Sequence, residues 1–493
     1  MKKLLAVISA FMIGAVFAAD DIYVARENEN ASDEPCEGRG TQALPYKTIQ
    51  AAVNAAGVGA TVWVDEGVYA DEPTTDPDGE KVRVAITNVR INLISLKGRE
   101  KTHIVGAHGT GDHGHGEGAV RGIYVNKADV VIAGFTIRDC AVASTSKNGG
   151  GVRLAGTGNC LAQCIIENCV AQRGGGVMGG MSLGCWFRRN VCTEDSTVGG
   201  AALYNGGALN SLFTENRDLS TGLGFVIAYP GSIVGCTVAG NIADCMASKY
   251  STSTYVFYNS VFADNRGMRI GTINISLTNC AFKAATTAYG QAGLCKEDLA
   301  DNAFLSPRTG DWRMTSAAGV EAVGDAKWLA NISLPAAAEK YRYLDVFGNA
   351  IPTSGAITCG AIQETVEAPC GALGFSETFA VDGAGDDSPE LPPAANYMRP
   401  AEYPTMLKVK AAAVNDTNLV YYLYDTTVRP PRQDGWICIV PPPTGSETLT
   451  PNYATAVVYA DAVNGSDAWD GSAATHEEGT DIGPKKTLQA AVD

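Results

Sequence analysis

The sequence predicts an all-β protein built as a right-handed parallel β-helix, with a short capping helix at its N-terminal end. Three observations predict this fold: a segment repeated between about residues 122 and 285, glycine-rich starts between the copies, and an amphipathic helical pattern ahead of them. The 493 residues are too many for one ordinary core, so we expect more than one structural unit. Hydrophobic residues make up 45% of the chain and charged residues 18%, which fits a folded protein.

The N-terminus has the pattern of a secretory signal peptide over residues 1–19. Lys2 and Lys3 form a charged start, residues 4–17 are almost all apolar, and Ala18 follows at the expected cleavage spacing. The apolar run is too short for a spanning helix, and no later stretch is long enough for one. We therefore expect the mature protein in an export compartment.

The predicted capping helix covers residues 48–57, "TIQAAVNAAG". Thr48 can cap its start, Ile49, Ala52 and Val53 share one face, and Gly57 ends it. A strand at residues 60–64 follows. Because an open end of a β-helix invites pairing with another chain, a helix at this place is expected to cover it.

Six segments of the middle region align, and a seventh is weaker. The apolar third position of these segments recurs after 29, 21, 26, 25, 24 and 20 residues. Such a unit cannot bury its own apolar face, but it can when stacked on a copy of itself with parallel strands about 4.8 Å apart. The segments are FTIRDC (135–140), CIIENC (164–169), CWFRRN (185–190), SLFTEN (211–216), CTVAGN (236–241), SVFADN (260–265) and CAFKAA (280–285).

Side chains alternate along a strand, so the first and third positions of each segment are expected to point inward. The first position then forms an interior ladder. It holds Phe135, Cys164, Cys185, Ser211, Cys236, Ser260 and Cys280. Export would favour disulfides among the 14 Cys, but Cys also packs well as a small buried hydrophobe. Parallel side chains suit disulfide torsion poorly, so we expect packing, and Cys140 with Cys169 is the pair to test for a bridge.

Asparagine recurs at the sixth position of four segments: Asn190, Asn216, Asn241 and Asn265. A strand turns a corner there. Asn tolerates unusual backbone angles, and its amide can bond to the neighbouring rungs. We therefore interpret these residues as a structural ladder rather than as catalytic groups.

The glycine-rich sequences GGGV and GGAL and the FxxN motifs at 187–190, 213–216 and 262–265 resemble the repeats of chlamydial polymorphic membrane proteins. Related repeats occur in secreted bacterial β-helix proteins of the pectin-lyase-like superfamily. The resemblance covers roughly residues 23–363, and residues 343–363 resemble the closing rungs of such proteins. It implies the fold and a bacterial protein that is secreted or held at the cell surface, in association with an outer membrane. It does not imply an activity, because one fold hosts many functions.

The chain changes character after the predicted β-helix of residues 20–365. Residues 366–456 are proline-rich and contain two strand patterns, at 419–425 and 435–440, which predicts a linker with a small β module. Residues 457–493 end in GPKKTLQAAVD, which echoes LPYKTIQAAVN at 44–54. We interpret this as the truncated start of a second β-helix, whose last ten or so residues lack a packing partner.

The loop GAHGTGDHGHGEG (106–118) is a weak candidate metal site. It carries His108, His113, His115, Asp112 and Glu117, which are ligand types for zinc, nickel or copper. Glycine flanks the ligands, so nothing in the sequence fixes their geometry. A loop inserted between two rungs explains the same composition.

Charged side chains lie at outward positions of the coils. The set comprises Arg138, Glu167, Arg188, Arg189, Glu194, Asp195, Glu215, Arg217, Asp218, Asp264, Arg266 and Arg269. The superfamily's lyases hold Ca²⁺ with carboxylates, and its hydrolases use paired carboxylates. Here the charges are scattered one or two per coil, as on a solvated outer face. We expect no cofactor, with Ca²⁺ only if the protein is a lyase.

The net charge of −16 excludes nucleic acid as a partner, because phosphates would be repelled. The sequence favours a non-catalytic adhesin or stalk that binds carbohydrate or another cell. The alternative is a polysaccharide lyase or glycoside hydrolase that acts on extracellular polysaccharide. The ligand, the catalytic residues and the oligomeric state stay open.

Overall fold

The computed structural model describes residues 21–366 apart from short gaps between 194 and 310, and the backbone of five short strands between 406 and 451. Residues 1–20 and 457–493 lie outside the described residues, as do Glu194, Asp195, Asp264 and Arg266. The predictions of a signal peptide and of a second β-helix therefore stay predictions.

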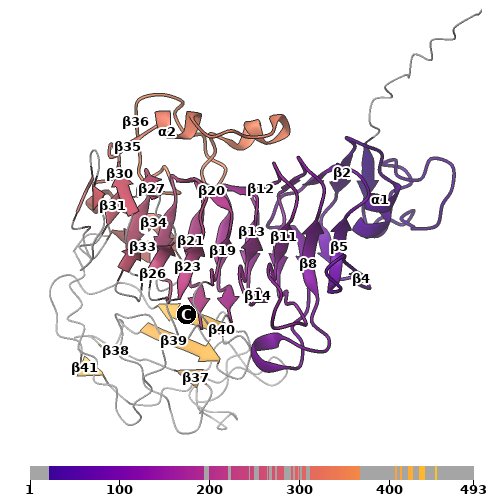
Figure 1. The fold of residues 1–493 in the computed structure, drawn as a ribbon, viewed down its shortest axis with the longest axis horizontal. Coiled ribbons are helices and arrows are strands. Elements are labelled where there is room, and N and C mark those ends of the chain that lie inside the picture. Colours follow the sequence, from indigo (N-terminus) through magenta and orange to yellow (C-terminus); the bar gives the residue numbers. More distant parts are fainter. Residues whose placement is uncertain are drawn as a thin grey trace, which may run out of the picture.

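The described chain confirms the predicted all-β parallel β-helix. It winds through three long sheets, one strand of each per coil (Figure 1). Sheet A contains β1 (Ile22–Val24), β2 (Thr61–Val64), β6 (Asn92–Ser95), β9 (Val131–Ala133), β12 (Cys160–Ala162), β16 (Met181–Leu183), β20 (Gly207–Leu209), β24 (Ile233–Val234), β27 (Tyr255–Tyr258), β30 (Ile275–Thr278) and β32 (Gly290–Gln291). Sheet B contains β3 (Gly67–Tyr69), β7 (Thr102–Val105), β10 (Thr136–Arg138), β13 (Ile165–Glu167), β17 (Trp186–Arg188), β21 (Leu212–Thr214), β25 (Thr237–Ala239), β28 (Val261–Ala263) and β31 (Ala281–Phe282).

Sheet C closes each coil. It contains β4 (Thr74–Thr75), β5 (Lys81–Ile86), β8 (Arg121–Val125), β11 (Val152–Leu154), β15 (Val177–Met178), β19 (Leu203–Tyr204), β23 (Phe225–Ala228), β26 (Cys245–Ser248) and β29 (Arg269–Gly271). A smaller sheet lies between sheets B and C and contains β14 (Val170–Ala171), β18 (Val191–Cys192) and β22 (Arg217–Asp218). Only the β4–β5 pair among these four sheets is antiparallel.

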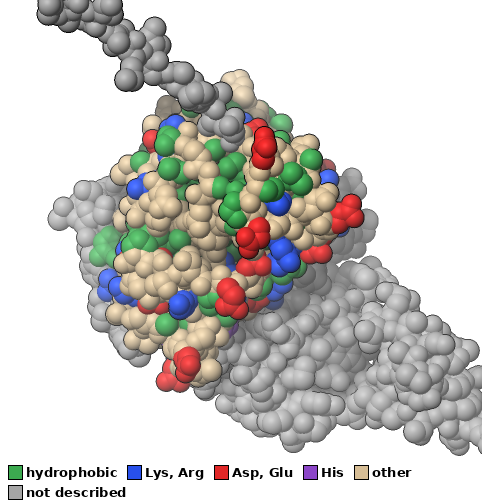
Figure 2. Space-filling view, turned by 90° about the vertical axis from the view of Figure 1, so that its right-hand side faces the viewer, with side chains coloured by type: hydrophobic (Ala, Val, Ile, Leu, Met, Phe, Trp, Pro, Cys, Tyr) green, Lys and Arg blue, Asp and Glu red, His purple; other side chains and the backbone are tan. Residues whose placement is uncertain are grey.

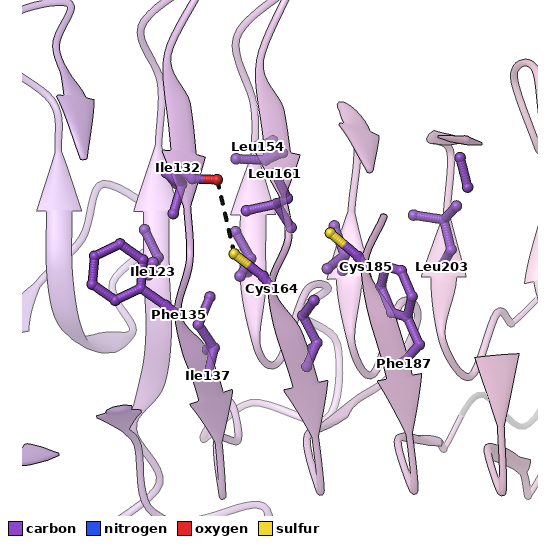
Figure 3. Packing of buried hydrophobic residues seen from close by; sticks show 14 of the residues in the cluster. Ile123, Ile132, Phe135, Ile137, Leu154, Leu161, Cys164, Cys185, Phe187 and Leu203 are labelled. Atoms are coloured by element: carbon purple, nitrogen blue, oxygen red, sulfur yellow. Dashed lines mark hydrogen bonds between the residues drawn. The ribbon is translucent and has the colours of Figure 1, made fainter. Parts of the chain in front are cut away.

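Apolar side chains of consecutive coils stack in register inside the solenoid. Ile137 pairs with Ile166, which pairs with Phe187, which pairs with Phe213. The rings of Phe187 and Phe213 stack with centroids 4.7 Å apart. The first-position residues form a second interior row, in which Phe135, Cys164 and Cys185 follow one another (Figure 3). The structure thus places the third and the first positions of the repeat inside, in two adjacent ladders.

The described cysteines of the interior are buried and free, including Cys140 and Cys169, Cys164 and Cys185, and Cys236 and Cys280. Ser211 and Ser260 occupy the same row, where their hydroxyls accept hydrogen bonds from the backbone N–H of Cys185 and Cys236 at 3.1 and 3.2 Å. Small side chains fill the rest of this row, and Phe135 is its one large member.

The sixth-position asparagines form a continuous buried ladder. The Nδ2 of Asn216 donates to Asn241 Oδ1 and to the Phe187 carbonyl, each at 2.9 Å. Asn190 makes the equivalent bond to Asn216, and Asn241 to Asn265, also at 2.9 Å. Each amide thereby binds both the backbone and the asparagine of the next coil, which satisfies polar groups that the corner leaves unpaired.

The expected unusual backbone angle lies one residue earlier than the ladder. Positive φ occurs at the fifth position of the segments, at Asp139, Asn168, Arg189 and Glu215, whereas the sixth-position asparagines do not have it. The fifth residue makes the left-handed turn, and the sixth then points its amide inward. The prediction that one asparagine performs both tasks is therefore wrong.

The N-terminal end is closed by helix α1 (Ile49–Ala55). The Thr48 side chain accepts a hydrogen bond from the Ala51 N–H at 3.2 Å, which caps the helix as predicted. Ile49, Ala52 and Val53 are buried in the same core as the first strands. Figure 2 shows this end from outside, where Asp and Glu side chains lie among the hydrophobic ones. Charges at an edge discourage pairing with another chain.

The C-terminal part of the described chain differs from the predicted closing rungs. Residues 311–363, called here the returning segment, fold back along the outside of the coils instead of adding to them (Figure 1). The segment covers apolar outer residues of sheet B such as Leu212, Val261 and Ala281. It begins at β34 (Asp311–Met314), which pairs with β33 (Phe304–Ser306), and contains η3 (Ser316–Ala318), β35 (Gly324–Asp325), α2 (Lys327–Ala330), η4 (Ala336–Tyr341) and β36 (Ala356–Ile357).

Side-chain amides at the corners between sheets A and B hold the returning segment. Gln163, Asn210, Asn259 and Asn279 all have positive φ there. Gln163 Nε2 donates to the Asp345 carbonyl at 2.9 Å, and Asn210 Nδ2 donates to the carbonyls of residues 342 and 344. Residues 343–363 add no rung to the solenoid. Gln163 and Asn210 bind their backbone at residues 344 and 345, and apolar side chains of this range cover the sheets.

The proline-rich region contains two strands that overlap the strand patterns at 419–425 and 435–440, and three shorter strands. β39 (Val420–Asp425) pairs with β40 (Arg432–Cys438) in antiparallel register, and β37 (Met406–Leu407) joins them. A further pair is β38 (Ala411–Ala412) with β41 (Thr450–Pro451). Within the described residues, no helix has the length and apolar character needed to cross a bilayer.

We expect Asn216→Ala to lower the free energy of unfolding by about 3 kcal/mol, because it leaves several buried backbone and amide groups without partners. Urea unfolding followed by circular dichroism measures the loss. Asn30→Ala is the matched control, since Asn30 is exposed in a loop. A loss equal to that of the control would contradict a structural ladder.

We expect the interior thiols to resist alkylation in the folded protein. Burial raises the pKa of Cys236 and Cys280 to about 12, and both are fully buried. Iodoacetamide at pH 8 should therefore label exposed Cys36 first and reach Cys236 and Cys280 only after unfolding. Peptide mass spectrometry with and without urea measures this, and equal labelling rates in the native state would contradict it.

Candidate functional site

A cleft of about 350 Å³ lies between the outer face of sheet A and the returning segment. Its floor comes from β24 and β27 and the turn before β24, and its roof from α2 and the residues after it. Gly231, Ser232, Val234, Val256, Tyr258, Trp328, Asn331 and Ile332 line it. Ser232 and Asn331 are exposed at the rim, so the cleft is open to solvent.

Two aromatic rings form one wall of the cleft. Tyr258 and Trp328 stack with their centroids 4.0 Å apart and their planes 24° from parallel. The Trp328 Nε1 donates to Asn279 Oδ1 at 3.0 Å, which puts the indole on the side of the following coil. Tyr258 also pairs in register with Val234 of the preceding coil, and both residues line the cleft.

The short helix α2 carries Trp328, and several contacts fix it to the solenoid. Asn259 bonds twice with the Asp325 backbone, through Nδ2 to the carbonyl at 2.9 Å and through Oδ1 to the N–H at 3.0 Å. On the far side, Arg342 Nη1 donates to the Leu329 carbonyl at 2.6 Å and holds Glu339 with two bonds of 2.7 Å. Hydrogen bonds to the solenoid and to Arg342 therefore hold the roof on both sides of Trp328 in the sequence.

The lining gives the cleft a defined chemistry. Tyr258 and Trp328 contribute aromatic surface, and Val234, Val256 and Ile332 add apolar surface. The Ser232 hydroxyl and the Asn331 amide supply donors and acceptors at the rim. An aromatic face with a few polar groups around it suits a ligand that has both apolar C–H surface and hydroxyl groups.

The predicted outer-face charges come together in one place, on sheet B and its corner. Glu167 Oε2 accepts from Arg188 Nε at 2.5 Å and lies 3.3 Å from Arg189 Nη2. Arg189 Nε is 3.9 Å from Glu215. One coil earlier, Arg138 pairs with Asp139. Opposite charges alternate from coil to coil, so each carboxylate of this cluster faces an arginine rather than another carboxylate.

The remaining outer charges lie elsewhere. Arg217 and Asp218 belong to β22 of the small sheet, and Asp218 accepts from the Phe225 N–H at 2.9 Å. The side chain of Arg269, on β29, lies outside the described residues. The described residues include no group of three or more His, Cys, Asp or Glu side chains placed to hold a metal ion.

The histidine loop is held in place rather than loose. His115 is buried, with Nδ1 2.7 Å from the Val142 carbonyl and Nε2 2.9 Å from Thr193 Oγ1. His108 Nε2 lies 2.8 Å from the Asn168 carbonyl. Asp112 and His113 form a short 3₁₀ turn, η1 (Asp112–Gly114). The weak metal candidates Asp112, His113 and His115 thus form no common ligand set, because His115 is bound to the solenoid through both ring nitrogens.

Sequence reasoning missed Tyr258 and Trp328. Tyr258 ends the strand ahead of the SVFADN repeat, and its outward position follows from strand alternation. Trp328 lies in a segment without repeats, so no pattern indicates which face of the solenoid it covers. The one available signal for Trp328 was a tryptophan in the sequence "KWLAN", which belongs to no predicted rung.

We expect Glu167→Gln to lower the free energy of unfolding by about 1 kcal/mol, because it removes a charge that two arginines contact. Urea unfolding at low and at high salt measures it, and the loss should shrink as salt screens the pair. Glu215→Gln is the control, since its contact with Arg189 is long. An effect of Glu167→Gln no larger than that of the control would contradict the ion-pair geometry.

No family model matches the chain, and no curated protein sequence matches it. Among solved structures, pectate lyase Pel9A covers 71% of this chain and 97% of its own, at 11% identity and a TM-score of 0.36. A pectin methylesterase variant in complex with a hexasaccharide covers 55% and 92%, at 13% identity and 0.33. A rhamnogalacturonan lyase covers 57% and 73%, also at 13% and 0.33.

Proposed function

We propose that this protein is a carbohydrate-binding β-helix that holds its ligand without cleaving it. The observation that carries the proposal is the cleft over sheet A, where the stacked rings of Tyr258 and Trp328 line a solvent-open space together with a hydroxyl and an amide. A sugar ring can place its C–H face on Tyr258 and direct its hydroxyls to Ser232 and Asn331.

The cleft suits binding better than cleavage. Glycoside hydrolysis needs two carboxyl groups on either side of the bond that breaks. The residues that line the cleft contain no carboxylate, and the carboxylates clustered on sheet B are each engaged by arginine. Catalysis by a lyase or hydrolase stays the alternative that the assay below distinguishes.

We also propose that the protein acts outside the cell or at its surface. The support is the charged and then apolar N-terminal sequence, together with a repeat that resembles those of exported β-helix proteins. An elongated solenoid that binds sugar at one side fits an adhesive or stalk-like role there.

We expect Tyr258→Ala to weaken binding at least tenfold, about 1.4 kcal/mol, because it removes the aromatic platform. Isothermal calorimetry against the best ligand of a polysaccharide panel measures it. Tyr258→Phe keeps the ring and should bind within about twofold of the wild type. Phe347→Ala is the control, since Phe347 is 45% exposed and lies outside the cleft.

The same panel tests for cleavage. The proposal expects no new reducing ends and no unsaturated products, with or without chelator. Release of either would overturn the non-catalytic reading. Equal binding by the wild type and Tyr258→Ala would show that the sugar does not bind in this cleft.

A further inference from the structure

We infer that the cleft over sheet A selects an uncharged sugar unit and discriminates against uronic acids. The inference rests on the proposed carbohydrate-binding function and adds the class of ligand. It comes from the charges of the lining: the eight residues that form the cleft include neither a cation nor an anion.

A carboxylate that entered this cleft would lose water without gaining a partner of opposite charge. Its neighbours would be the Tyr258 ring and the aliphatic side chains of Val234, Val256 and Ile332. Burying an ionised group against such surface is costly unless a charged or strongly hydrogen-bonding partner compensates. A hydroxymethyl group at the same place costs far less, because Ser232 or Asn331 at the rim can satisfy it.

Lys327 precedes the lining residue Trp328 in the sequence, and its ammonium group contacts Asp325. Its Nζ lies 2.7 Å from Asp325 Oδ2 and 5.0 Å from the centre of the Trp328 ring. The hydrogen bond from Lys327 lowers the pKa of the Asp325 carboxyl group, so the pair carries opposite charges at neutral pH. Lys327 is thus held against Asp325 and the indole rather than directed at a ligand.

The size of the cleft and the net charge of the chain also favour a short, uncharged sugar ligand. A volume of about 350 Å³ is at the lower end of the range for ligand pockets, which suits a short stretch of sugar rather than a long chain. The net charge of −16 also repels an anionic polymer at long range.

The test uses pairs of disaccharides that differ only at carbon 6: glucose with glucuronate, galactose with galacturonate, and mannose with mannuronate units. We expect the neutral member of at least one pair to bind at least tenfold more tightly than its uronate, with an affinity that does not change between low and high salt. A uronate that binds equally or better would overturn the inference while leaving the proposed function intact. If neither member of any pair binds, and no longer neutral glycan does, the proposed function itself fails.

A gain of charge gives the complementary test. Ser232→Lys places a cation at the exposed rim, where it does not disturb the core, and should raise uronate affinity about tenfold. Asn30→Lys makes the same change of net charge far from the cleft and is the control. If both variants gain equally, only the net charge matters and the assignment of selectivity to the cleft is wrong. If neither gains, a uronate is excluded for another reason and the inference is likewise wrong.

Discussion

The structure depends on one constraint: each coil must lie in register on the one before it. A single coil cannot bury its inward side chains, so its stability comes from the faces it shares with its neighbours. In the apolar core, the inward side chains of consecutive coils pair in register, as in the row Ile137, Ile166, Phe187 and Phe213. The asparagine ladder shows the same dependence in polar form, since Asn190, Asn216 and Asn241 each donate to the asparagine of the next coil.

The same constraint shapes the outer surface. Outward side chains on successive coils also form rows. When the type of outward residue changes from one coil to the next, the chemical character of the surface changes along the solenoid axis. On sheet B, charges alternate over the middle coils and apolar residues follow from Leu212 onward. The returning segment covers the apolar coils, and its roof over sheet A creates the cleft around Tyr258.

The repeat and its consequences were predictable from the sequence, whereas the site was not. The spacing of Phe and Asn identifies the interior ladders because identical coils must place identical residues at identical positions. The left-handed corner was predicted at the sixth residue and lies at the fifth, and the sixth residue points its amide into the ladder. Trp328 escaped prediction since a segment that folds back has no period, and its position depends on amides of four coils distant in sequence.

The corner amides have a consequence for how the molecule comes apart. In a bare solenoid each coil touches only its neighbours, so coils can be lost from an end one at a time. Here, corner amides of four coils bind the returning segment instead, so coils far apart in the stack are joined to one another. These amides belong to Gln163, Asn210, Asn259 and Asn279. Under a pulling force the coils from Gln163 onward share the load and yield together, while those closer to α1 can peel away singly. The returning segment thus joins part of the stack of coils into one mechanical unit.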